Sequence, residues 1–241
     1  MTSSFRLGYV PGVTPAKWAR IWAERLPRTP IELIQVGAAD AVGLVHSADA
    51  DAALVRLPID RTGLHAIPLY VEQTVVVVPK DHVVTAAEEV TLEDLADELI
   101  LHPQDDVLAW EQPLPGRVID DRPATTADAI ALVAMGTGLL VVPMSLARLH
   151  HRKDLTFRPL TDAPTSQVAL TWPEDAESEL MEEFVGIVRG RTANSTRGSQ
   201  KPPEPKKAAK KQAAPKKQQQ IRPNKVKGKP GQPTPKRKYK R

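Results

Sequence analysis

The sequence of 241 residues contains no cysteine. This absence excludes disulfides, thiolate metal sites and cysteine nucleophiles, and it fits a protein of the reducing cytosol. No apolar run is long enough to span a bilayer, and the N-terminus MTSSFRLGYVPG lacks the basic start and apolar stretch of a signal peptide. We therefore expect a cytoplasmic protein with no membrane partner.

Acidic residues are almost missing from the end of the chain. Residues 191–241 contain 18 Lys and Arg but one acidic residue, whereas residues 1–190 contain 15 Lys and Arg and 28 Asp and Glu. The formal net charge of +4 therefore conceals an acidic body of charge −13 and a basic tail of charge +17.

The tail also lacks the apolar side chains that a core needs. Its large apolar residues are Ile221, Val226 and Tyr239, and eight of its residues are proline. Burial cannot offset the entropy cost of ordering such a segment, so we predict that residues 191–241 are disordered.

In composition the tail resembles histone-like basic tails, and we expect it to bind DNA or RNA without sequence preference. The cations expected to do so are Lys206, Lys207, Lys210, Lys211, Lys216, Lys217, Lys236, Arg237, Lys238, Lys240 and Arg241. Two other interpretations stay open: the tail could bind acidic protein surfaces, its own body included, or serve only to keep the protein in solution.

The body alternates strand-like and helix-like segments, which is typical of an α/β fold with mostly parallel strands. Strands are expected at 5–10, 31–36, 51–57, 73–79, 99–101, 117–120, 138–143, 155–160 and 167–172. Helices are expected at 15–26, 38–47, 91–97, 125–136, 144–150 and 176–190. Thr14 and Thr125 are expected to cap two of these helices.

Five phrases of the body, in collinear order from Arg6 to Arg189, resemble one known family. They are RLGYVPGVTP, DAALVRLPIDRTGLHAIPLYVEQTVVVVPKDH, TLEDLADELIL, TTADAIALVAMGTGLLVVPMSLARL and QVALTW. Taken together, they resemble the effector-binding domain of LysR-type transcriptional regulators.

The resemblance implies a two-lobed, periplasmic-binding-protein-like (type 2) α/β fold, with two crossover strands and a small effector in the cleft. The domain would be residues 1–190, with lobe one at 5–78 and 168–190 and lobe two at 79–167. The crossovers would lie near Val78 and Ala169. By family analogy we also expect a homodimer with a role in transcriptional regulation.

The sequence departs from the family pattern in two places. Met1 stands four residues ahead of the first strand, so we expect the family's N-terminal winged helix-turn-helix to be lacking. Residues 102–120 are shorter than their usual counterpart and broken by proline, and we expect no helix there.

Helix N-termini that face the cleft are the natural place for an anionic effector such as a carboxylate, because their N–H groups are unpaired. The effector-binding candidates are Gly12, Val13, Thr14, Arg56, His102, Thr125 and Thr126. Thr14 and Thr125 could instead act only as caps, and Arg56 could form an ion pair with an acid such as Asp60 rather than bind a carboxylate. His102 could equally be an ordinary structural histidine.

The residues show no nucleophile with its base and orienting partner, so we expect no enzyme, no cofactor and no metal. The acidic pairs Asp105-Asp106 and Asp120-Asp121 are interpreted as solvated loop charges. Two functions lead: a sensor of a small effector with a nucleic-acid-binding tail, or a protein-interaction and dimerisation module whose cleft is vestigial. An enzyme of the same two-lobed fold stays open as a third, minor hypothesis.

Overall fold

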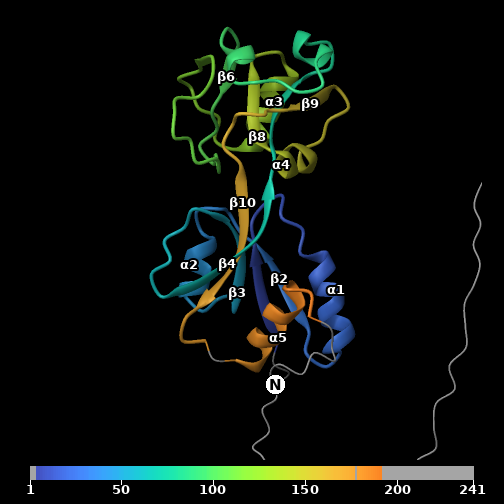
Figure 1. Cartoon of the computed structure of the whole chain (residues 1–241), viewed down its shortest axis with the longest axis vertical. Coiled ribbons are helices and arrows are strands. Elements are labelled where there is room, and N and C mark those ends of the chain that lie inside the picture. The colour runs from blue at the N-terminus through green and yellow to red at the C-terminus, as the bar shows by residue number, and fades with distance from the viewer. Residues whose placement is uncertain (1–3, 177, 192–241) are drawn as a thin grey trace, which may run out of the picture. The chain divides into compact units, whose positions relative to one another are not determined.

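Two five-stranded sheets, each with its own helices, make up the two lobes of the body (Figure 1). The computed structural model describes residues 4–176 and 178–191, which belong to one compact unit. The predictions of disorder and of nucleic-acid contact in the tail concern residues outside this described part, apart from Arg191. The α/β class is confirmed.

The first lobe is built on a mixed sheet with the strand order β2-β1-β3-β10-β4. Its strands are β1 (Phe5–Tyr9), β2 (Ile31–Gln35), β3 (Ala52–Leu57), β4 (Leu64–Glu72) and β10 (Ser166–Pro173). β1 runs parallel to β2 and β3, whereas β10 runs antiparallel to β3 and β4. The continuous apolar run of β3 is buried from Ala52 to Arg56, as its central position in the sheet requires.

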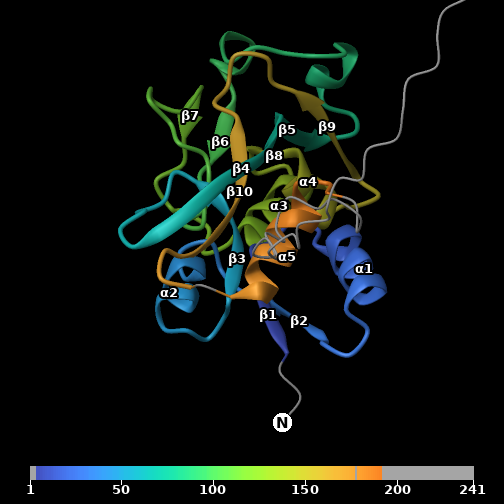
Figure 2. The ribbon, with the colours of Figure 1, turned by 60° about the horizontal axis from the view of Figure 1, so that its bottom comes forward.

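Helices cover both faces of this sheet (Figure 2). α1 (Ala16–Arg25) and α5 (Glu179–Val188) lie on one face, and α2 (Ala41–His46) lies on the other. Phe5 of β1, Trp22 of α1 and Phe184 of α5 stack at the centre of the core, with ring centroids 4.7–5.9 Å apart. This aromatic cluster joins both helices to the sheet.

The second lobe is built on a sheet with the strand order β7-β6-β8-β5-β9. Its strands are β5 (Thr74–Pro79), β6 (Leu99–Leu101), β7 (Arg117–Val118), β8 (Leu139–Pro143) and β9 (Leu155–Pro159). Its helices are the 3-10 turns η1 (Val83–Ala86) and η2 (Glu93–Leu95) and the α-helices α3 (Thr126–Ala134) and α4 (Met144–Leu149). Buried aliphatic clusters lie on both faces of this sheet.

The chain passes between the two sheets twice (Figure 1). β4 ends at Glu72 in the first sheet and β5 begins at Thr74 in the second, so the first passage lies at Gln73. The second passage lies between β9 and the start of β10 at Ser166. The crossovers predicted near Val78 and Ala169 were therefore placed too far along the sequence, because β5 pairs entirely within the second sheet and β10 entirely within the first.

Three other predictions on local structure were wrong. Helix α1 begins one residue later than expected, with Pro15 rather than Thr14 at its N-cap. The segment 91–97 forms only the 3-10 turn η2, and residues 64–72, where no strand was expected, form a nine-residue edge strand in which Pro68 is tolerated. As expected, residues 102–116 contain no helix or strand. None of the described helices combines the length and the apolar character needed to cross a membrane.

Candidate functional site

Three polar side chains meet where the two lobes join. Arg56 extends from β3, Glu72 ends β4, and Ser145 lies in the first turn of α4 in the second lobe. The Nη2 group of Arg56 lies 3.2 Å from Oε2 of Glu72 and donates to Oγ of Ser145 at 3.0 Å. The Ser145 hydroxyl in turn donates to Oε2 of Glu72 at 2.9 Å. We call Arg56, Glu72 and Ser145 the lobe joint.

The positive charge of Arg56 is largely balanced by other groups of the protein. The side chains of Arg56 and Glu72 are 2% and 9% exposed, and Nη2 also donates to the carbonyl oxygen of Pro11 at 3.1 Å. Burial lowers the pKa of the Arg56 guanidinium, and the nearby Glu72 carboxylate opposes this change. The Nη1 group of Arg56 is buried and has no hydrogen-bond partner among the described residues.

Gly12 lies directly against the lobe joint. A Cβ atom at this position would come within 2.6 Å of Oγ of Ser145 and 2.9 Å of Nη2 of Arg56. The backbone there also has φ of +83°, which side-chain-bearing residues rarely adopt. Glycine is therefore needed for the loop before α1 to pack on the second lobe.

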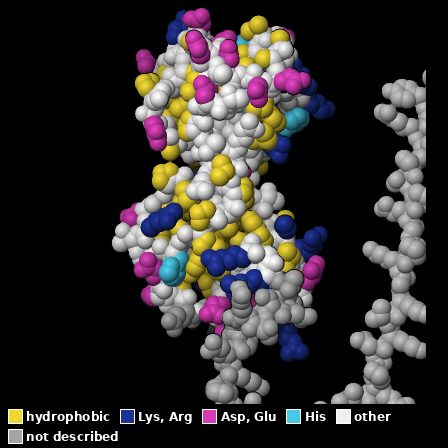
Figure 3. All heavy atoms as spheres, in the orientation of Figure 1, with side chains coloured by type: hydrophobic (Ala, Val, Ile, Leu, Met, Phe, Trp, Pro, Cys, Tyr) yellow, Lys and Arg dark blue, Asp and Glu magenta, His cyan; other side chains and the backbone are white. Residues whose placement is uncertain are grey.

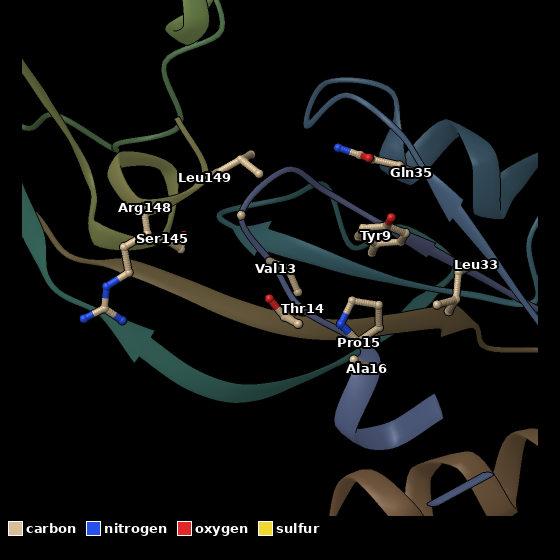
Figure 4. Close-up of a pocket in the computed structure, with 11 residues that line it drawn as sticks. Tyr9, Val13, Thr14, Pro15, Ala16, Leu33, Gln35, Ser145, Arg148 and Leu149 are labelled. Carbon is tan, nitrogen blue, oxygen red and sulfur yellow. The ribbon is translucent and has the colours of Figure 1, made fainter. Parts of the chain in front are cut away.

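The larger of two adjoining cavities, of about 560 Å³, opens between the start of α1 and helix α4. Figure 4 shows Thr14, Pro15 and Ala16 on one side and the α4 residues on the other, and the guanidinium of Arg148 points away from Tyr9. The residues around this cavity are Tyr9, Gly12, Val13, Thr14, Pro15, Ala16, Leu33, Gln35, Ser145, Arg148 and Leu149. No acidic side chain is among them.

The smaller cavity, of about 260 Å³, shares Gln35 and Leu149 with the larger one. It is lined from the first lobe by Val10, Pro11, Gln35, Gly37, Ala38 and Arg56, and from the second by Asp105, Val107, Thr125, Thr126, Ala127, Leu146, Leu149 and His150. Most of this wall is apolar, with a few polar groups at defined positions, as is usual for small-molecule sites.

The first turn of α3 reaches the smaller cavity with its polar groups already engaged. The Thr125 hydroxyl accepts from the N–H of Asp128 at 3.1 Å, so the predicted cap is confirmed. The buried Thr126 hydroxyl donates to Oδ1 of Asp105 at 2.9 Å. A carboxylate of the protein therefore lies beside the turn where sequence reasoning placed the carboxylate of an effector.

The predicted site residues fall into three groups. Gly12, Val13 and Thr14 line the larger cavity, and Arg56, Thr125 and Thr126 line the smaller one. His102 lines neither cavity, because its Nε2 faces Oδ2 of Asp106 at 3.2 Å.

Arg56 does form the ion pair that was weighed against effector binding, but its partner is Glu72 and not Asp60, the example given. Asp60 accepts hydrogen bonds from the N–H and hydroxyl of Thr62 at 2.9 and 2.7 Å, while Glu72 takes its place beside Arg56. Sequence reasoning missed both Glu72 and Ser145. Within the described ranges, no group of three or more His, Asp or Glu side chains is arranged to hold a metal ion.

The two lobes, the double passage between them and the cavities at their junction define a two-lobed small-ligand-binding domain. A family model for the LysR substrate binding domain matches residues 3–193, and the chain belongs to this family. The resemblance inferred from the sequence is confirmed, and with it the periplasmic-binding-protein-like fold class.

Relatives of known role are regulators of transcription. The HTH-type transcriptional regulator AlsR of Bacillus subtilis (strain 168) is 25% identical over 184 residues, which are 70% of this chain and 59% of AlsR. A probable hydrogen peroxide-inducible genes activator of Mycobacterium avium is 26% identical over 156 residues, 60% of this chain and 50% of that protein. The chain thus spans between half and three-fifths of the length of these relatives.

Solved structures of similar fold include the BenM effector binding domain with its effector benzoate. It has a TM-score of 0.65 at 20% identity, covering 78% of this chain and 91% of that one. The oxidised form of OxyR has a TM-score of 0.65 at 19% identity, covering 78% of this chain and 94% of that one. At these identities the likeness concerns the fold.

Proposed function

We propose that this protein senses a small carboxylate effector in the cavities between its lobes and takes part in transcriptional regulation. Family membership supports the general role. The observation that carries the proposal is the larger cavity, in which the start of the ten-residue helix α1 faces a wall that contains Arg148 and no acidic side chain.

The carboxylate would bind at the first turn of α1. The first N–H groups of a helix have no partner within it, and the helix dipole favours an anion there. The Thr14 hydroxyl lies at this turn, and Arg148 of α4 lines the same cavity. Its guanidinium points away from Tyr9 in Figure 4, so pairing with the carboxylate would require this side chain to swing across. The apolar part of the effector would extend into the smaller cavity, toward Val107 and Leu146.

A thermal-shift screen of the full chain with small carboxylates tests this site. We expect at least one of them to raise the melting temperature, because a ligand that binds only the folded state stabilises it. Thr14→Val should reduce that rise, whereas Thr137→Val, at an exposed turn away from both cavities, should leave it unchanged. If no carboxylate raises the melting temperature, the cleft is vestigial and the body is an interaction module.

The basic tail would bind DNA or RNA through its charge alone. The second lobe is a poor substitute for it, because residues 81–116 contain ten acidic residues and no Lys or Arg, and acidic side chains gather over this lobe (Figure 3). Lysines such as Lys206 and Lys236 would pair with phosphates, and the affinity would come largely from the release of counterions.

Electrophoretic retardation of unrelated DNA and RNA fragments tests the tail. We expect the full chain to retard both, and a chain that ends at residue 193 to retard neither. Engagement of six or more phosphates would lower the affinity about a thousandfold between 50 and 200 mM salt. If the shortened chain binds as well as the full chain, the tail is not the nucleic-acid contact, and its binding to acidic protein surfaces becomes the stronger interpretation.

A homodimer in the cytoplasm is the form in which we propose that the protein acts. β2 is an edge strand of the first sheet, so one side of its backbone is free to pair with a second copy of the protein. Sedimentation equilibrium of the full chain should give twice the monomer mass, and a monomer mass at micromolar concentration would contradict the dimer.

A further inference from the structure

The charges on the walls of the two cavities are arranged unevenly. Arg56, Asp105, Arg148 and the titratable His150 are the residues there that can carry a charge. Arg56 is balanced by Glu72 within the lobe joint. Neither Asp105 nor Arg148 takes part in an ion pair with another described residue. Arg148 therefore contributes a cationic side chain to the wall of the larger cavity, and Asp105, which is exposed to solvent, contributes a carboxylate without an ion pair to the wall of the smaller one.

The carboxylate of Asp105 is held in place by a buried partner. Thr126 is 3% exposed, and its hydroxyl donates to one oxygen of Asp105 at 2.9 Å. Because a carboxylate can accept about four hydrogen bonds, most of the acceptor capacity of Asp105 stays free for a ligand. A second anion in the smaller cavity would be repelled by Asp105, whereas a cationic donor would be attracted.

We infer that the effector carries a protonated amine that binds Asp105, in addition to its carboxylate. This inference rests on the proposed function, which places the carboxylate at the start of α1 in the larger cavity. The two cavities share the wall residues Gln35 and Leu149 and so lie side by side, and the inference places one molecule across both. The effector class is then an amino carboxylate whose two charged groups are separated by an apolar segment.

Calorimetric titration of the full chain with matched compounds tests this inference. The probes are linear carboxylates of four to six carbons, each with and without an amino group at the far end. We expect the amino compounds to bind about tenfold more tightly than their plain counterparts, the gain of one charge-assisted hydrogen bond. Asp105→Asn keeps an oxygen for the Thr126 hydroxyl but should abolish the advantage of the amino compounds while leaving the plain carboxylates unaffected.

Asp121→Asn, an exposed aspartate outside both cavities, is the matched control and should leave both affinities unchanged. If plain and amino carboxylates bind the wild type equally, the amine is not recognised, while the carboxylate site stands. An amino preference that survives in Asp105→Asn would overturn the role of Asp105. If neither kind of compound binds, it is the proposed carboxylate site itself that fails.

Discussion

Each lobe has a five-stranded sheet, but the faces of the two sheets are covered by different kinds of structure. In the first lobe, α-helices lie on both faces and an aromatic cluster of Phe5, Trp22 and Phe184 ties two of them to the sheet. In the second lobe, α3 and α4 pack on one face, and the other face is covered by 3-10 turns and the irregular segment 102–116.

This difference shows how an irregular segment can replace a helix. Leu108 is buried in the core of the second lobe, and Trp110 and Leu114 pack against the same cluster. Asp105 and Val107, from the same segment, line the smaller cavity. The segment 102–116 therefore covers the sheet with some of its side chains and shapes the cavity with others.

The largest effect that we predict is on the free energy of unfolding, when one tryptophan is replaced in each lobe. Trp22 is fully buried and its Nε1 donates to the carbonyl oxygen of Thr29 at 2.8 Å, whereas Trp110 is half-buried and its Nε1 donates to Oδ2 of Asp106 at 2.9 Å. Trp22→Ala should lower the free energy of unfolding by about 4 kcal/mol, because it empties the centre of the aromatic cluster. Trp110→Ala should cost about 2 kcal/mol.

Urea unfolding followed by circular dichroism measures both variants. Each variant loses one indole hydrogen bond, to a carbonyl oxygen in Trp22→Ala and to a carboxylate in Trp110→Ala, so a larger loss in Trp22→Ala reports on packing. Equal losses would mean that the irregular cover of the second lobe is packed as tightly as the helical core of the first.

The next effect concerns the lobe joint, where the two lobes depend on each other. Arg56→Met leaves Glu72 buried without its cation, and we expect a loss of about 3 kcal/mol in the free energy of unfolding. Arg25 supplies the matched control, because its ion pair with Glu183 at 2.8 Å lies within the first lobe and is more exposed. Arg25→Met should cost less than about 1 kcal/mol.

The lobe joint should also fix the spacing of the lobes. Because the chain has no cysteine, spin labels can be attached at Lys17→Cys and Lys153→Cys, both exposed and in different lobes. Arg56→Met should broaden the distribution of distances between the labels, and Arg25→Met should not. An unchanged distribution in Arg56→Met would show that the lobes are held in register without this ion pair.

The sequence is a good guide to the elements and a poor guide to the lobe joint. Continuous apolar runs correctly predict β3, β5 and β8, because a strand buried on both faces needs apolar side chains throughout. The cap of α3 is also readable, because Thr125 and Asp128 interact over a short and regular spacing.

Glu72 and Ser145 give no such signal. Their contacts with Arg56 join three segments that are distant in sequence: Ser145 lies 89 residues from Arg56 and 73 residues from Glu72. A glutamate at the end of an edge strand and a serine in the first turn of a short helix would each be expected at the surface. The cavities are unpredictable for the same reason, since their walls come from both lobes.

The smallest effect that we predict is on the melting temperature, when one exposed aspartate is replaced in each lobe. Hydrogen bonds from the N–H and hydroxyl of Thr62 lower the pKa of Asp60, and those of Thr91 lower the pKa of Asp94. The charged carboxylates therefore stabilise the native state above about pH 5, and this contribution is lost as the pH falls below about 4. Asp60→Asn and Asp94→Asn should each melt slightly below the wild type at pH 6, and the difference should shrink at pH 3. If the two variants lower the melting temperature by similar amounts, the contrast between the lobes lies in their cores and not in their turns. If the lower melting temperatures persist at pH 3, the charge of the carboxylates is not the cause.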